Sequence, residues 1–170
     1  MKKTIRNLVL AAAFAASPPL AGMAIAGTAT GTFTVSATVL NNCSITTNNL
    51  VFGNYYASGT STNSTSVGVN CGLLGVDILP AMTVSISAGN SGTPASRYML
   101  QSTTHLNYNI YTTLGYSKVW GDGTSGSMTQ SYNGLLSIGT IGFTGYGQLP
   151  AGQYVTQGGY NDTITVTVSF

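Results

Sequence analysis

Few side chains in this sequence have the types and spacing that catalysis requires. The chain has one histidine, His105, and three acidic residues, Asp77, Asp122 and Asp162. A serine, His105 and one aspartate are enough for a catalytic triad, but no Gly-x-Ser-x-Gly nucleophile elbow occurs in a strand–turn–helix setting. Paired-carboxylate chemistry needs two neighbouring acids, and these three lie far apart along the chain. The sequence therefore predicts a protein that is not an enzyme.

The two cysteines, Cys43 and Cys71, are the remaining reactive side chains. A zinc site needs about four ligands, and only one histidine is present to add to the cysteines. An even number of cysteines in an exported chain is typical of a disulfide. Closing a 28-residue separation is expected to stabilise the fold by about 3.5 kcal/mol in the chain-entropy model. We expect a Cys43–Cys71 disulfide, no metal and no cofactor.

Residues 1–26 have the organisation of a cleavable signal peptide. Lys2, Lys3 and Arg6 form a basic start, and an apolar run follows over residues 8–16. Ala24-Ile25-Ala26 supplies the small-x-small pattern of a signal-peptidase site. The apolar run is too short for a membrane span, although a retained anchor helix is the alternative. We expect cleavage between Ala26 and Gly27 and export through the periplasm.

Removal of this segment changes the charge of the chain. Three of the five basic residues leave with it, so that Arg97 and Lys118 stand against three aspartates and the formal charge becomes −1. No basic patch is present to neutralise phosphates, so nucleic acid is not an expected partner. So few charges are unusual for a soluble monomer and suit a chain that is buried in an assembly.

Short strand-like segments recur after residue 26, and no helical pattern is found there. They are predicted over residues 33–40, 50–56, 65–70, 82–87, 97–101, 106–112, 117–120, 135–143 and 162–170. Clusters of Gly, Ser, Asn and Asp separate them. This spacing predicts one all-β domain, a sandwich or a barrel.

The clearest alternation lies at the two ends of the mature chain. In residues 29–39 small or apolar residues alternate with Thr and Ser, and residues 162–170 repeat the pattern. Each of these strands has one apolar face and needs a neighbour to bury it. The first strand can pair within its own sandwich, which periodicity alone favours, or it can fill a gap in another copy by donor-strand complementation.

Several motifs in order give the chain a family resemblance. They are Cys43, Leu50-Val51-Phe52-Gly53-Asn54-Tyr55, Val69-Asn70-Cys71, Arg97-Tyr98-Met99-Leu100, Leu106-Asn107-Tyr108-Asn109-Ile110-Tyr111, Val119-Trp120-Gly121-Asp122-Gly123, Leu149-Pro150-Ala151-Gly152-Gln153-Tyr154 and Gly159-Tyr160-Asn161-Asp162 with the final strand. Together they resemble the spore coat protein U domain, the family that includes subunits of archaic (alternative) chaperone–usher pili. The resemblance covers essentially the whole mature chain.

The resemblance implies an all-β fold, an incomplete immunoglobulin-like β-sandwich that a donor strand from a neighbouring subunit completes. Residues 27–38 would be the donor arm and residues 39–170 the domain. The donor face would be Phe33, Val35, Ala37 and Val39, and the acceptor groove would be lined by Ile164, Val166, Val168 and Phe170. The implied partners are other pilus subunits or copies of the chain, a periplasmic chaperone and an outer-membrane usher. The implied product is an extracellular fibre that supports surface attachment or biofilm formation.

Two alternatives stay open. A spore-coat or surface-coat structural protein with the same domain would also be exported and β-rich. A carbohydrate-binding adhesin could present the aromatic faces of Tyr108, Tyr111, Tyr116, Trp120 and Tyr132 to sugars, although such residues also fill the cores of ordinary sandwiches.

Overall fold

The structure, a computed structural model, describes residues 30–37, 41–73, 81–134 and 139–170. The chain divides into two compact units, Met1–Ala37 and Thr38–Phe170. The predicted signal peptide, its Ala26/Gly27 cleavage site and Val39 of the predicted donor face lie outside the described residues.

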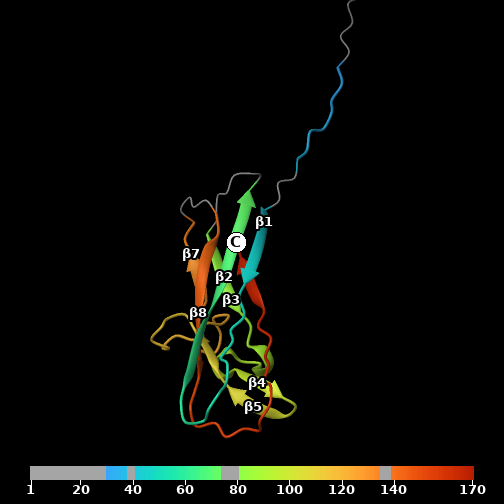
Figure 1. The fold of residues 1–170 in the computed structure, drawn as a ribbon. Helices are drawn as coiled ribbons and strands as arrows, with labels where there is room; N and C mark the ends of the chain where they lie inside the picture. Colours follow the sequence, from blue (N-terminus) through green and yellow to red (C-terminus); the bar gives the residue numbers. More distant parts are fainter. Residues whose placement is uncertain (1–29, 38–40, 74–80, 135–138) are drawn as a thin grey trace, which may run out of the picture. The chain divides into compact units, whose positions relative to one another are not determined.

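The second unit is built from strands and two short 3₁₀ helices in its described part (Figure 1). The strands are β1 (Asn41–Thr47), β2 (Ser61–Leu73), β3 (Met82–Ile86), β4 (Tyr98–Gln101), β5 (Thr104–Asn107), β6 (Asn109–Tyr111), β7 (Gln130–Tyr132), β8 (Ile141–Leu149) and β9 (Val166–Ser169). The 3₁₀ helices are η1 (Gly89–Ser91) and η2 (Pro94–Ser96). The all-β prediction is therefore confirmed.

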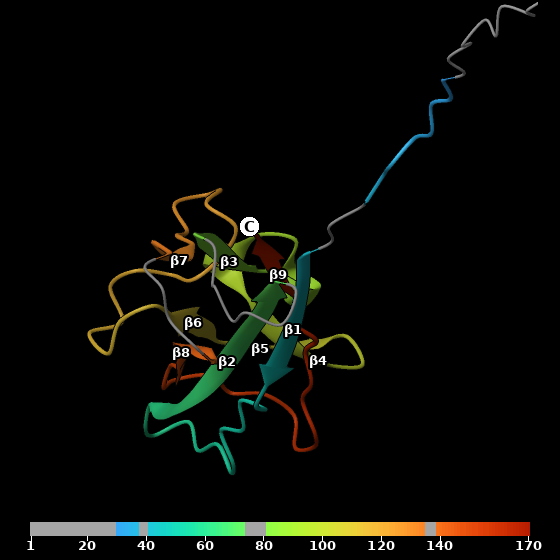
Figure 2. The same ribbon diagram turned by 90° about the horizontal axis from the view of Figure 1, so that it is seen from above.

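Two antiparallel sheets face each other across one core (Figure 2). One sheet has the order β1-β2-β8-β6 and the other β7-β3-β9, while β4 and β5 form a separate hairpin. The core lies between the sheets because the strands turn alternate apolar residues inward. Val67 and Val69 of β2 face Val84 and Ile86 of β3 in this way, and all four are buried.

A buried tryptophan links the two sheets. Trp120 has no exposed surface, and its backbone amide donates to the carbonyl of Ile110 in β6. Its indole Nε1 donates a 3.1 Å hydrogen bond to the carbonyl of Val84 in β3. The indole therefore fills the core and satisfies its one polar group, as a buried tryptophan requires.

The predicted strands at 82–87 and 97–101 are present, whereas others differ from the structure. Residues 50–56 are irregular, because the carbonyls of Val51 and Phe52 accept hydrogen bonds from the side chains of Asn63 and Ser61 in β2 instead of joining a ladder. Residues 106–112 divide between β5 and β6, which pair in different sheets. Residues 117–120 make only isolated bridges. Of the strand predicted at 135–143, residues 135–138 lie outside the described residues and residues 141–143 begin β8.

The described part of the first unit, residues 30–37, forms no strand and is exposed throughout. Phe33 and Val35 are 87% and 82% exposed. Residues 33–37 therefore do not form the strand that the alternating pattern at 33–40 predicts, because a lone extended segment has no ladder to join. Residues 38–40 lie outside the described residues. Within residues 30–37, 41–73, 81–134 and 139–170, no helix is long and apolar enough to cross a membrane.

Candidate functional site

The candidate site lies between two sheet edges that are open on one side. Among the described strands β1 pairs only with β2, and β9 pairs only with β3. The carbonyl of Thr165 accepts a hydrogen bond from the amide of Ser87, so the backbone groups of Thr165 face the β3 side. Successive residues of a strand direct their N–H and C=O groups to opposite sides. The backbone groups of Ile164, Val166 and Val168 therefore face the open edge.

The same alternation applies to β1. The amide of Asn48 donates to the carbonyl of Ser66, which turns the backbone of Asn48 toward β2 and that of Thr47 away from it. Backbone donors and acceptors on the outer sides of β1 and β9, which have no partner strand among the described residues, thus border the same gap between the sheets. Such open edges are templates for pairing with a further strand.

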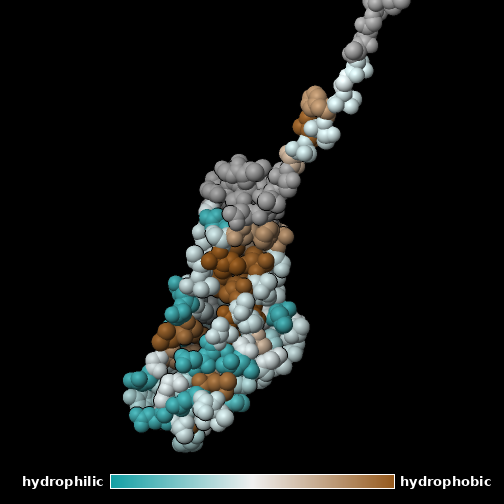
Figure 3. All heavy atoms as spheres, turned by 90° about the vertical axis from the view of Figure 1, so that its right-hand side faces the viewer, coloured by the Kyte–Doolittle hydropathy of each residue, from teal (hydrophilic) through white to brown (hydrophobic). Residues whose placement is uncertain are grey.

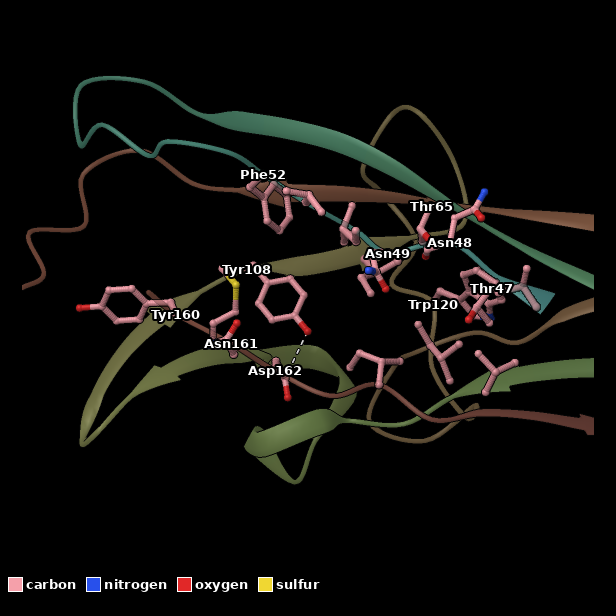
Figure 4. Close-up of a pocket in the computed structure, with 18 residues that line it drawn as sticks. Thr47, Asn48, Asn49, Phe52, Thr65, Tyr108, Trp120, Tyr160, Asn161 and Asp162 are labelled. Atoms are coloured by element: carbon pink, nitrogen blue, oxygen red, sulfur yellow. Dashed lines mark hydrogen bonds between the residues drawn. The ribbon is translucent and has the colours of Figure 1, made fainter. Parts of the chain in front are cut away.

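A groove of about 420 Å³, lined by both apolar and polar residues, lies between these edges. Leu50 and Phe52 line it on the β1 side, and Ile164 and Val166 line it on the β9 side. Figure 3 shows apolar side chains gathered along this face of the domain. The close-up in Figure 4 places Phe52 on one wall and Asp162 on the other.

The floor of the groove depends on two glycines of β8. Gly145 and Gly147 occupy inward positions of the strand, where a side chain would be expected. A Cβ at Gly145 would lie 2.9 Å from Ile110 and 3.1 Å from the ring of Trp120. A Cβ at Gly147 would lie 2.7 Å from Leu50 and 2.9 Å from Phe52. Because these two positions have no side chain, the neighbouring residues can pack closely against the backbone of β8 at the groove floor.

A chain of contacts crosses the groove floor from one wall to the other. The rings of Phe52 and Tyr108 meet edge to face, with centroids 5.9 Å apart. The hydroxyl of Tyr108 then donates a 2.7 Å hydrogen bond to Oδ2 of Asp162 (Figure 4). Burial is the main reason that the pKa of Tyr108 is raised well above its usual value, and the hydrogen bond and negative charge of Asp162 add to this effect. Tyr108 therefore stays protonated and keeps donating.

Asp162 also holds the loop beside it. Its Oδ1 accepts hydrogen bonds from the amides of Asn90 at 2.9 Å and Thr163 at 2.7 Å. Gly89 packs against this carboxylate so closely, at a φ of +65°, that a Cβ there would lie 2.2 Å from Oδ2. The carboxylate thus holds the backbone segment that leads into β9.

Arg97 is fully buried beneath the same region. Its guanidinium donates to the carbonyl of Ser87 at 2.6 and 3.0 Å and to Oδ1 of Asn109 at 2.9 Å. Burial lowers the pKa of Arg97, while its electrostatic interactions with Tyr108, Asp162 and Asp122, in that order, act in the opposite direction. Every buried side-chain nitrogen and oxygen of the described residues has a hydrogen-bond partner, so this network supports the fold and leaves no polar group aimed at a ligand.

Cys43 and Cys71 form the predicted disulfide. They lie directly opposite each other in the register of β1 and β2. The bond therefore attaches the edge strand β1 to the sheet and holds one wall of the groove.

The comparisons with known proteins agree with this architecture. The profile of the Spore Coat Protein U domain matches residues 29–167. The chain belongs to the Spore Coat Protein U domain family. It is also 32% identical to Protein U of Myxococcus xanthus, an alignment that covers 98% of each protein.

A solved structure resembles the fold of this Spore Coat Protein U domain. It is a chain of the crystal structure of the CsuC–CsuE chaperone–tip adhesion subunit pre-assembly complex from the archaic chaperone–usher Csu pili of Acinetobacter baumannii. The TM-score is 0.54, with 25% sequence identity over 78% of this chain. This chain spans 41% of the length of that one.

The four predicted acceptor residues differ in their burial and in whether they line the groove. Ile164 and Val166 line the groove, and Val168 is half-buried against the core. Phe170 is 52% exposed at the chain end and does not line it. Phe33, Val35 and Ala37 of the predicted donor face are exposed in the first unit. The sequence did not lead us to predict Phe52 and Tyr108 as groove residues, although the alternating glycines of β8 indicate that other residues approach the strand closely at this place.

The described residues that were considered for catalysis, His105, Asp122 and Asp162, make separate contacts in this fold. His105 stacks on Tyr98 in the β4–β5 hairpin, with ring centroids 3.9 Å apart. Asp122 accepts hydrogen bonds from Thr124 and Ser127 within its own turn, which lower its pKa, while Asp162 binds Tyr108. Asp77 lies outside the described residues. No group of three metal-ligating side chains occurs in the described part of the chain.

The structure also shows where the five aromatic residues considered for sugar binding lie. Tyr108 and Trp120 are buried in the core, so they present no face to a sugar. Tyr111, the last residue of β6, packs edge to face against Tyr116 in the following loop, with ring centroids 5.5 Å apart. Tyr132 lies half-buried in β7 against the core. This set of five residues therefore does not form one binding surface.

Proposed function

We propose that the protein is a structural subunit of a secreted chaperone–usher pilus and that it polymerises by donor-strand complementation. The arm of one copy, residues 27–38, would lie between β1 and β9 of the next copy and complete its sandwich. A periplasmic chaperone would cover the groove before assembly, and an outer-membrane usher would exchange chaperone for arm. The resulting extracellular fibre would support attachment to surfaces or biofilm formation.

The observation that carries the proposal is the groove between two open strand edges. An inserted strand would pair with backbone groups on the outer side of Ile164 and Val166, each new hydrogen bond contributing about 0.5–1.5 kcal/mol. It would also cover an apolar floor that water otherwise meets. The resemblance to a chain of the CsuC–CsuE complex supports the same assignment of partners.

The arm has the properties that such an insertion needs. Phe33 and Val35 are both more than four-fifths exposed in the single chain, and burying each would contribute about 1.5–3 kcal/mol. Thr34 lies between them and Ser36 follows Val35, and both of these side chains would face outward from the groove. Because the donor and acceptor surfaces differ, the contact does not close on itself and extends into a fibre.

A surface-coat or spore-coat structural protein is the second candidate. The similarity to Protein U across 98% of both proteins and the family itself favour it. In that case the same strand exchange would link copies in a layer. Electron microscopy of expressing cells with and without the gene distinguishes the two, because a pilus appears as thin fibres and a coat as a continuous layer.

A self-complemented chain tests the strand exchange itself. Residues 28–39 are fused after Phe170 through a flexible turn, so that the copied arm can fold back beside β9. Occupancy of the groove is expected to raise the melting temperature by about 10 °C or more and to block polymerisation. A fusion with Asn in place of the copied Phe33 and Val35 is the matched control and should lack both effects. An unchanged melting temperature in the first fusion would refute the open groove.

A further inference from the structure

A second cavity lies at the end of the domain drawn lowest in Figure 1. It has a volume of about 790 Å³ and is bordered by the segments 50–57 and 149–161. This is within the range of about 300–1,000 Å³ that is usual for sites of small organic ligands. The cavity adjoins the first groove and shares part of its lining with it, namely Leu50, Val51, Phe52, Met99, Tyr160 and Asn161, while its other lining residues belong to this cavity and not to the groove.

Hydrogen bonds between the two segments hold the rim in place. The hydroxyl of Tyr55 donates to the carbonyl of Pro150 at 2.8 Å and accepts from the amide of Gln153 at 3.0 Å. The amide of Gly152 donates to the carbonyl of Ala57 at 2.7 Å. The Gln153 side chain also bonds both backbone groups of Asn107, at 2.7 and 2.8 Å. The cavity is therefore formed before any ligand arrives, which lowers the cost of ordering its rim on binding.

Four other side chains of the rim are exposed and make no hydrogen bond with the described residues. They are Tyr56 and Tyr154, which are 70% and 91% exposed, and Asn54 and Gln157. None of the four lines the first groove. The rim thus has two kinds of polar residue, those that brace it and those that remain available to a ligand.

The available groups match one class of ligand. Tyrosine faces pack against apolar C–H surfaces and keep a hydroxyl for hydrogen bonding. Planar amides donate and accept at once, as pairs of neighbouring sugar hydroxyls do. No Asp, Glu, Lys, Arg or His is present among the described residues that line the cavity. We propose that this cavity is a binding site for a neutral saccharide, with Tyr154 and Tyr56 as stacking platforms and Asn54 and Gln157 as hydroxyl-binding amides.

A second copy of the chain is a less suitable occupant of this surface. The core of an interface between protein copies is usually apolar and desolvated, and aromatic residues, tyrosine included, are enriched in it. Tyr56, Tyr154 and the exposed Val51 would suit such a core, whereas the exposed amides of Asn54 and Gln157 would each need a hydrogen-bond partner there. The saccharide site does not depend on polymerisation, because it uses neither the arm nor the edge of β9.

The test uses the purified full chain and a panel of methyl glycosides. Methyl glycosides of glucose, galactose, mannose and N-acetylglucosamine are titrated by NMR, with methyl glucuronide as the charged comparison. At least one neutral glycoside is expected to bind, and the glucuronide more weakly. Tyr154→Ala and Tyr56→Ala should each weaken binding about fivefold or more, whereas Tyr154→Phe should change it less than twofold. Leu114→Ala, at an exposed position outside the cavity, is the matched control and should bind as the unmodified chain does.

Three results would overturn the proposal. The first is no binding of any neutral glycoside at tens of millimolar. The second is binding that Tyr154→Ala and Tyr56→Ala leave unchanged while both variants keep the melting temperature of the original chain. The third is loss of association between copies in these variants without glycoside binding, which would assign the surface to a protein contact. An unchanged melting temperature of the self-complemented chain would refute the strand exchange and leave the saccharide result unaffected, so the two proposals fail independently.

Discussion

The hydroxyl of Tyr108 donates a 2.7 Å hydrogen bond to the carboxylate of Asp162, a residue 54 positions later in the sequence. Tyr108 stands between β5 and β6, and Asp162 precedes β9, so the bond joins segments on opposite sides of the groove. Asp162 in turn binds the amide of Asn90 beside η1. This one contact therefore sets the position at which β9 begins.

Replacing Tyr108 with Phe should lower the free energy of unfolding by about 1.5–3 kcal/mol, the usual contribution of a hydrogen bond to a charged group. The ring contact with Phe52 would be kept. Urea unfolding measures the change, and Tyr98→Phe, which removes a hydroxyl bonded to the carbonyl of Asn90 at the surface, is the control. Equal losses in the two variants would contradict a special role for Tyr108.

The same pair predicts a dependence on alkaline pH. The pKa of Tyr108 is raised in the folded state, mainly by burial, whereas in the unfolded chain it is about 10. The contribution of neutral Tyr108 to stability is therefore complete below pH 10. It falls above pH 10, because the unfolded state then releases a proton that the folded state retains.

The difference in unfolding free energy between the original chain and Tyr108→Phe should accordingly narrow between pH 10 and 11, by up to about 1.4 kcal/mol per pH unit. Paired urea titrations at pH 9, 10 and 11 measure it. The other tyrosines titrate in both proteins and cancel in the comparison. Parallel curves across this range would show that Tyr108 does not carry the effect.

Two glycines of β8 offer a matched test of the groove floor. A Cβ at Gly147 meets the ends of the Leu50 and Phe52 side chains, which line the groove and would have to shift. Gly147→Ala should therefore reduce binding of a peptide of residues 27–38 by about tenfold, with a smaller effect on stability. Gly142→Ala, on the exposed side of the same strand with nothing within 4 Å, should leave binding unchanged. Similar affinities in the two variants, measured by fluorescence anisotropy, would argue against this floor.

Loss of the disulfide should weaken the β1 wall. Replacing Cys43 and Cys71 with Ser is expected to cost about 2–4 kcal/mol of unfolding free energy and to lower the yield of exported protein. Hydrogen exchange should show faster exchange of β1 amides than of β8 amides in this variant, because β1 has only β2 as a neighbour among the described strands. Uniform exchange across both strands would contradict a local role for the bond.

The donor face can be tested on the arm alone. Phe33→Asp places a charge on the side proposed to enter the groove and should reduce fibre formation to a small fraction of normal. Thr32→Asp places the same charge on the opposite side of the segment and should allow assembly. Neither change should alter the melting temperature of the isolated chain, since residues 30–37 are exposed there. Fibre yield measured by electron microscopy would contradict the proposal if both variants assembled equally.

Much of the fold could be predicted because it follows local rules. Alternation identified β3 and the half-buried row of Ile164, Val166 and Val168, and cysteine pairing identified the disulfide. Residues 50–56 were predicted incorrectly because their apolar content resembles a strand. Their carbonyls are instead satisfied by the side chains of β2, and such distant partners leave no periodic trace.

By itself, the sequence determined that the protein is all-β, that its two cysteines are joined and that residues 29–39 and 162–170 each have an alternating pattern with one apolar face. Only the tertiary structure decided that β1 and β9 border one groove, that glycines form part of its floor and that Tyr108 reaches Asp162. The physical reason is that alternation is a property of neighbouring residues along one strand. Which two edges face each other depends on the order of strands in two packed sheets, and contacts between residues far apart in the chain establish that order.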